Sequence, residues 1–165
     1  MKLIVSDASP LIVIAKSGLL PVLTALVEEV VIPETVYAEC TVEISLPGAR
    51  AVRAAGETGQ ILVRPDAKAP SGDPGDELAG LDAGELAAIH MASALECPVL
   101  MDERLGRQVA KRRGITVIGS AGLLLAAKKR GLVPAVAPIL DQWQQSGYFL
   151  SASVVKAVLD RAGEA

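Results

Sequence analysis

The stretch Leu3-Ile4-Val5-Ser6-Asp7-Ala8-Ser9-Pro10 decides the fold of this chain. Its apolar residues predict a short buried strand, and Ser9-Pro10 opens a helical pattern that runs over residues 10–16. Ser is favoured as a helix N-cap and Pro in the first turn, so we expect Ser9 to cap this helix. Asp7 then has no capping role and stands at the end of a strand, where open α/β sheets bind their ligands. We therefore predict that Asp7 is a metal-binding carboxylate.

Short apolar runs alternate with helical patterns along the rest of the chain. Further strands are expected at residues 30–32, 61–63, 98–101 and 115–118, and helices at 19–26, 34–40, 47–55, 81–95, 104–113, 119–131, 134–145 and 151–162. This alternation predicts a mostly parallel sheet with helices on both faces. Residues 65–80 are rich in Pro, Ser, Gly and Asp and predict an exposed, mobile loop. We expect a single domain over residues 1–165, in which about 134–165 is a helical extension.

Composition bounds the class of protein. Of the 165 residues 51% are apolar, and only four are aromatic, so we expect a core of Leu, Ile, Val and Ala. Trp143, Tyr148 and Phe149 are expected to pack the C-terminal helices. No apolar stretch reaches the roughly 18 residues of a membrane span, and two cysteines are too few for a disulfide framework. These features predict a cytoplasmic protein, and the aliphatic excess favours a homo-oligomer, most simply a dimer.

Charge is unevenly distributed along the chain. The formal net charge is −3, yet residues 104–130 contain half of the 16 Lys and Arg residues and no acid. Arg104, Arg107 and Lys111 fall at i, i+3 and i+7 of one expected helix, so they share a face. This stripe is either a solvated face or a flank that binds phosphates beside a metal site.

Four acids stand where a parallel sheet can gather them: Asp7, Glu39, Glu85 and Asp102. Asp7 and Asp102 end predicted strands, and Glu85 lies in the first turn of a helix, so these positions can meet at one edge of the sheet. Clustered carboxylates suit Mg²⁺ or Mn²⁺, and without a cation they repel and raise one another's pKa. We predict Asp7, Glu85 and Asp102 as metal ligands, Glu39 as a further catalytic acid, and Ser9 in support.

Each of these acids also has a structural interpretation, and it is weakest for Asp7, because Ser9 is expected to take the local capping role. Glu85 follows Asp82 by three residues, as in a capping box, and Asp102 could cap the helix that follows it. Glu39 could be solvated on its helix. His90, the only histidine, lies about 140° round the helix from Glu85, so we interpret it as structural or exposed. Without a second histidine or a suitably placed cysteine, the sequence does not support a nucleophilic triad or a zinc site.

Four acidic features follow one another along the chain. They are residues 6–11 (Ser-Asp-Ala-Ser-Pro-Leu), Glu39, residues 81–85 (Leu-Asp-Ala-Gly-Glu) and residues 101–104 (Met-Asp-Glu-Arg). With these segments the sequence resembles the PIN-domain nucleases. Residues 117–124 and 128–134 resemble a prokaryotic branch of PIN-like proteins. The resemblance therefore extends over nearly the whole chain.

The resemblance implies a three-layer α/β/α fold around a five-stranded sheet, with extra helices at the C-terminus. It also implies Mg²⁺- or Mn²⁺-dependent cleavage of RNA, as in VapC-type toxins of toxin–antitoxin pairs, whose partner is a small antitoxin protein. By position, the metal-binding acids would be Asp7, Glu39, Glu85 and Asp102, with Ser9 in support. The chain departs from the common toxin pattern directly after Asp102 and in its longer C-terminal extension.

Two other functional classes stay open. A PIN-like module could bind or regulate a partner without significant catalysis. A phosphoryl-transfer domain of the receiver or haloacid-dehalogenase kind would also use a strand-end aspartate. The dehalogenase pattern, however, requires a second Asp where this chain has Ser9, and the receiver requires a Lys where it has Gly119-Ser120.

Overall fold

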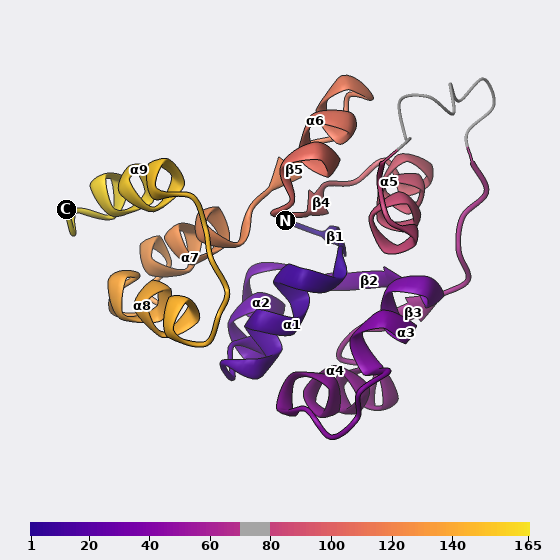
Figure 1. Ribbon diagram of the computed structural model, residues 1–165, viewed down its shortest axis with the longest axis horizontal. Coiled ribbons are helices and arrows are strands. Elements are labelled where there is room, and N and C mark those ends of the chain that lie inside the picture. Colours follow the sequence, from indigo (N-terminus) through magenta and orange to yellow (C-terminus); the bar gives the residue numbers. More distant parts are fainter. Residues whose placement is uncertain (70–79) are drawn as a thin grey trace.

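The computed structural model describes residues 1–69 and 80–165 (Figure 1). The strands are β1 (Leu3–Ser6), β2 (Glu29–Pro33), β3 (Leu62–Arg64), β4 (Val99–Leu100) and β5 (Val117–Ile118). The helices are α1 (Ala8–Lys16), α2 (Leu20–Leu26), α3 (Glu34–Thr41), α4 (Pro47–Thr58), α5 (Ala83–Leu95), α6 (Arg104–Arg112), α7 (Ser120–Lys129), α8 (Ala137–Gln145) and α9 (Ala152–Ala162). The loop predicted at residues 65–80 falls for the most part on residues 70–79, which lie outside the described ranges.

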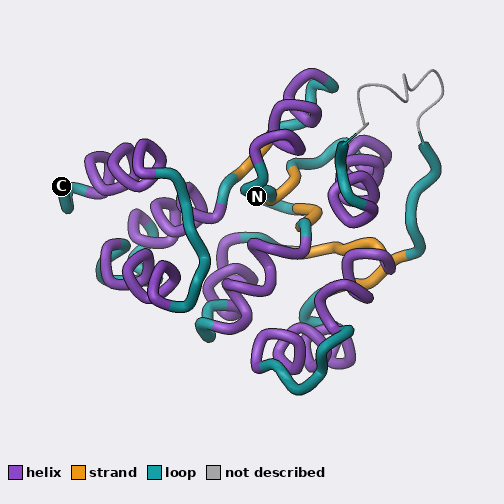
Figure 2. The backbone as a smooth tube through the Cα atoms, viewed as in Figure 1, coloured by secondary structure: helices purple, strands orange, loops and turns teal. Residues whose placement is uncertain are grey.

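The five strands form one parallel sheet in the order β3-β2-β1-β4-β5. Its central strand, β1, pairs Val5 with Val31 of β2 on one side and with Val99 of β4 on the other. The chain builds outward from β1 to β3 and then returns to the other side of β1, so the strand order reverses between β1 and β4. Helices flank the sheet in the manner of a three-layer α/β/α fold (Figure 2). The predicted α/β class and parallel sheet are confirmed.

The central strand lies deep in the core. Ile4 and Val5 have no exposed surface, and Leu11 and Ile14 of α1 pack with them. Strands covered on both faces are apolar without alternation, which is why residues 3–5 read as a continuous apolar run. Taken singly, none of the helices in the described ranges is long and apolar enough to cross a membrane. α1 and α2 reach that length only as a pair, and the pair is bent by 119°.

The start of α1 differs from the prediction. The helix begins at Ala8, so Asp7 and not Ser9 occupies the N-cap position, with extended backbone angles (φ −77°, ψ 167°). The Asp7 side chain nevertheless makes no capping hydrogen bond. Ser9 lies exposed in the first turn. The predicted Ser9 cap is therefore wrong, although the Asp7 carboxylate is still not used for capping.

The end of α4 also differs from the prediction, which ended this helix at residue 55, just before Gly56. A Cβ atom at Gly56 would lie 2.7 Å from Cε1 of Tyr37, so this glycine allows α3 and α4 to approach closely. The helix continues to Thr58 and ends at Gly59, whose φ of +79° is the left-handed conformation that glycine adopts readily.

The C-terminal extension is anchored to the N-terminal half of the chain. The Trp143 side chain is 1% exposed, and its Nε1 donates a hydrogen bond of 3.1 Å to Oγ of Ser17, just after α1. Tyr148 meets the Trp143 ring edge-on, with 5.9 Å between ring centroids. These two aromatics pack the C-terminal helices as predicted, whereas Phe149 is 73% exposed, so the prediction for Phe149 is wrong.

Candidate acidic site

Two of the predicted acids stand at neighbouring strand ends. Asp7 follows β1 and Asp102 comes two residues after β4, and Ser6 pairs with Leu100 in the parallel ladder between these strands. The Asp7 N–H donates a hydrogen bond of 3.0 Å to the Leu100 carbonyl, which fixes the backbone of β1 against β4. Both side chains therefore start at the point where the strand order reverses, as the sequence predicted.

The Asp7 carboxyl is buried among other acids. The residue is 4% exposed, and burial is the main reason why its pKa rises from 3.8 to about 6. The Ala8 N–H opposes this shift, while the negative charges of Asp82, Glu39 and Asp102 add to it. Within the described ranges, no Lys or Arg forms an ion pair with Asp7. Ionised Asp7 is therefore a buried charge that the Ala8 N–H offsets only in part.

Glu39 reaches the site from α3 and rests on the start of α5. A Cβ atom at Gly84 would lie 2.5 and 2.6 Å from the two carboxylate oxygens of Glu39, so only glycine leaves room for this approach. Partial burial and the charge of Asp82 raise the pKa of Glu39, and the Gly84 N–H partly offsets them. Glu39 is an exposed residue overall, but its carboxylate contacts backbone, which differs from the solvated interpretation.

Glu85 and Asp82 share the first turn of α5. Oδ1 of Asp82 accepts a hydrogen bond of 2.7 Å from the Glu85 N–H, so the capping role predicted for Asp82 is confirmed. The pKa of Glu85 rises to about 8 through partial burial first, then through a hydrogen bond with Asp82 and the charges of Asp82, Glu103 and Asp7. The Asp82 N-cap and the acidic cluster therefore coexist.

Asp102 does not cap α6. Glu103 does so, since its Oε2 accepts a hydrogen bond of 2.7 Å from the Gly106 N–H. The Asp102 carboxylate instead faces the start of α7, where Oδ1 accepts from the Ser120 N–H (2.8 Å) and Oδ2 from the Ser120 hydroxyl (2.5 Å). The Tyr148 hydroxyl, from the segment between α8 and α9, also donates to Oδ2. The C-terminal extension thus holds a predicted site residue in place.

The structure adds Asp82, Ser120 and Tyr148 to the residues around the predicted acids. Ser120 comes two residues after β5, as Asp102 does after β4, and this repeated position was a signal for it. Nothing local in the sequence indicates Tyr148, which is 46 residues from its partner. Ser9, predicted in support, makes no contact with the acids that the described structure records.

The carboxylates do not form a closed metal cage in this conformation. Across residues 1–69 and 80–165, no group of three His, Cys, Asp or Glu side chains is close enough together to hold an ion. The charges of Glu39, Asp82 and Asp102 nevertheless raise the pKa of Asp7, and the charge of Asp7 raises the pKa of Glu85. The arrangement is an acidic cluster around Asp7, made of Glu39, Asp82, Glu85 and Asp102.

Two other potentially reactive side chains lie in the core. His90 is 8% exposed on α5, which agrees with a structural interpretation. Cys40 is buried on α3, where burial and then the charges of Glu39 and Asp7 raise its pKa to about 12. A thiol with so high a pKa is a poor nucleophile and a poor metal ligand at neutral pH.

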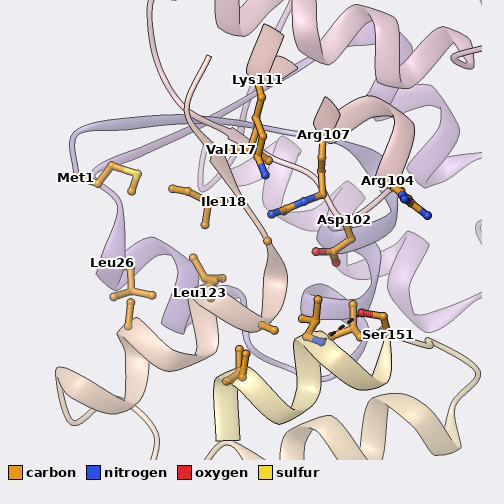
Figure 3. A pocket seen from close by; sticks show the side chains of 18 of the residues that line it. Met1, Leu26, Asp102, Arg104, Arg107, Lys111, Val117, Ile118, Leu123 and Ser151 are labelled. Carbon is orange, nitrogen blue, oxygen red and sulfur yellow. Dashed lines mark hydrogen bonds between the residues drawn. The ribbon is translucent and has the colours of Figure 1, made fainter. Parts of the chain in front are cut away.

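The predicted basic stripe lies beside Asp102, at one side of the acidic cluster. Arg104, Arg107 and Lys111 line a cavity of about 990 Å³ whose lining also includes Asp102 (Figure 3). Arg107 is held at the boundary, because its Nη1 donates a hydrogen bond of 2.8 Å to the carbonyl of Met101. Cations and acids therefore occupy adjoining parts of one surface.

Comparison with protein families agrees with this geometry. Residues 3–164 match the family model DUF3368, described as a PIN domain. A search of curated proteins gives no match. PIN domains are generally nucleases and typically use divalent metals. Because the match spans almost the whole chain and the sheet order places acids at neighbouring strand ends, the chain belongs to the PIN-domain family.

Proposed function

We propose that the chain is a metal-dependent ribonuclease that hydrolyses RNA phosphodiester bonds at the acidic cluster around Asp7. The observation that carries this proposal is the Asp7 carboxyl, which is 4% exposed, has a pKa of about 6 and lies among other acids. Such a group destabilises the fold when ionised, and acids whose pKa values are strongly raised by burial and by neighbouring charges are typical of functional sites. Membership of a family of nucleases supports the same conclusion.

The donor set fits a hard divalent cation. Asp7, Glu85 and Asp102 would hold it, with Glu39 beside them, and all four present the carboxylate oxygens that Mg²⁺ and Mn²⁺ prefer. The absent side chain at Gly84, which lets the Glu39 carboxylate approach α5, supports this fit. When bound, the ion supplies charge stabilisation for the phosphate and lowers the pKa of a water molecule.

The chain's own groups would orient the site and receive the substrate. Ser120 and Tyr148 hold the Asp102 carboxylate by three hydrogen bonds, and a carboxylate has about four lone-pair positions, so one remains for a further partner. Glu85, with a pKa of about 8, holds its proton at neutral pH and would have to give it up to serve as a metal ligand. Arg107 lies next to Asp102 and can neutralise phosphate charge.

The toxin role, a small antitoxin partner and a homodimer stay predictions from the sequence resemblance and composition. A PIN-like module without catalysis also stays open. Such a module would keep the fold but would have no need of an ionisable carboxyl buried among other acids. The cluster around Asp7 therefore favours the enzyme.

The first prediction concerns activity. Asp7→Asn keeps the size of the side chain but removes its charge, so cleavage of single-stranded RNA in Mn²⁺ should fall by about two to three orders of magnitude. Asp141→Asn, at an exposed position on α8, is the control and should cleave like the wild type. Equal cleavage by wild type and Asp7→Asn, or cleavage that survives chelation of metal, would contradict the proposal.

The second prediction concerns Gly84. A methyl group in Gly84→Ala would displace the Glu39 carboxylate, so cleavage should fall by about tenfold or more. The free energy of unfolding should change by less than about 1 kcal/mol, because alanine favours the helix and the displaced group is the end of a flexible side chain. In a Glu39→Ala background, Gly84→Ala should have no further effect on cleavage. The same loss in both backgrounds would show that Gly84 does not act through Glu39.

The third prediction concerns the stability of the metal-free protein. Because folding raises the pKa of Asp7 from 3.8 to about 6, the fold favours its protonated form. Stability from this group is complete below pH 3.8, is lost as the pH rises to about 6, and stays lost above that value, a change of about 3 kcal/mol. Asp7→Asn should therefore be more stable than the wild type at pH 7, and this difference should vanish near pH 4.

Urea unfolding with a metal chelator present measures this difference. Adding Mn²⁺ at pH 7 should stabilise the wild type and leave Asp7→Asn nearly unchanged, since ligand binding stabilises only the form that binds. If Asp7→Asn is less stable than the wild type at pH 7 with the chelator present, Asp7 serves the fold and not a cation site.

A further inference from the structure

The cavity beside the acidic cluster is lined by elements from distant parts of the chain. It measures about 990 Å³ and lies between α6, β5, α7 and α9 (Figure 3). Its floor is aliphatic, and Asp102 belongs to its lining. The floor includes Leu26, Val117, Ile118, Leu123, Val154 and Val158. The cavity therefore joins an apolar floor to the acidic site.

The charge of the lining is opposite to that of the chain. Among the described residues that line the cavity, four are cations and one, Asp102, is an acid, whereas the whole chain has a net charge of −3. Figure 3 shows Arg107 and Lys111 projecting from α6 over the cavity, with Arg104 turned to the far side of Asp102. Arg130, at the end of α7, supplies the fourth cation. This rim is suited to an anionic ligand.

The arginines of the rim are held in place by backbone. Arg107 Nη1 donates to the Met101 carbonyl (2.8 Å) and Arg130 Nη1 to the Ala25 carbonyl (3.0 Å), which leaves the other donors of each guanidinium available. A Cβ atom at Gly119 would lie 2.9 Å from Nη1 of Arg107 and 3.2 Å from Oδ1 of Asp102. Arg107 thus lies where the cavity meets the acidic cluster. Arginines that are held in place in this way recognise phosphates.

We propose that this cavity binds a nucleotide next to the scissile phosphate of single-stranded RNA. The base lies on the aliphatic floor, and its phosphate contacts Arg107 and Lys111. The volume is of the size that holds small ligands, and the lining combines apolar contact with a few convergent polar groups. Phe149, 73% exposed and part of the lining, offers an aromatic face for stacking.

This inference rests on the proposed function, because the substrate strand must pass Asp102 to be cleaved there. An acidic amphipathic peptide would satisfy the same charges. The adjoining catalytic acid favours RNA, since a strand bound at Arg107 and Lys111 continues directly to Asp102. A nucleotide in this cavity would contact α9 and Phe149, so the C-terminal extension would take part in substrate binding as well as in stability.

The test measures RNA binding with metal chelated, so that no cleavage occurs. Fluorescence anisotropy follows a labelled single-stranded RNA of about eight nucleotides, within the site sizes of single-strand binders. Lys111→Ala should weaken binding about five- to tenfold and reduce the salt slope of log K by about 1. Arg112→Ala removes one charge from an exposed position of the same helix outside the cavity, and should weaken binding less than about twofold.

A second variant tests the floor without changing charge. Ala126 on α7 is exposed and lines the cavity, so Ala126→Trp fills the space with little risk to the core. RNA binding should weaken about tenfold, whereas Ala54→Trp, exposed on α4, should bind like the wild type. An oligonucleotide with abasic sites should bind the wild type several-fold more weakly than intact RNA does. Ala126→Trp should bind the two oligonucleotides with equal affinity.

The outcomes separate this inference from the proposed function. RNA binding that is unchanged in both Lys111→Ala and Ala126→Trp would overturn the nucleotide site, even if the wild type cleaves RNA, and would leave the cavity to a protein partner. Binding that depends on both residues would support the site. It would do so even if cleavage were absent, in which case the proposed hydrolysis alone would fail.

Discussion

The structure depends on keeping a carboxyl group buried at the end of its central strand. Asp7 follows the central strand of the sheet, and its backbone is tied to β4 through the Leu100 carbonyl. The residue is 4% exposed, so its side chain is packed within the fold. Its ionised form is opposed by burial and by three neighbouring acids. A fold that holds this group in place gives up stability at neutral pH, and a bound cation is the simplest compensation.

The parts around Asp7 follow from this constraint. Gly84 makes room for the Glu39 carboxylate, and Asp82 satisfies the start of α5, so Glu85 is not needed for capping. Asp102 is oriented from across the molecule by Tyr148, whose neighbour in space, Trp143, is anchored to Ser17. The C-terminal extension is thereby connected both to the end of the first helix and to the acidic cluster.

Local patterns in the sequence predicted the strands, their parallel pairing and the acids at their ends, because apolar runs and strand-end residues are contiguous in sequence. The cap of α1 was mispredicted because Asp and Ser both favour the N-cap, and only burial decides which one takes it. Gly56 and Gly59 look equally like a helix end, yet one contacts the Tyr37 ring and the other adopts φ of +79°.

Contacts between distant segments left no local pattern. The contact of Tyr148 with Asp102 joins residues 46 positions apart, and that of Glu39 with Gly84 depends on how α3 packs against α5. Such contacts are set by tertiary packing, which periodicity and capping motifs do not encode. The sequence therefore predicted four acids of the candidate site, but not Asp82 or the residues that position these acids.

The most direct test of the central claim is calorimetric titration of the wild type with Mn²⁺ at pH 7, repeated in buffers of different ionisation enthalpy. If a cation binds among acids whose pKa values are raised, to about 6 for Asp7 and about 8 for Glu85, binding should release about one proton. Saturable binding with proton release is the predicted result. The absence of Mn²⁺ binding, or binding without release of protons, would contradict the account.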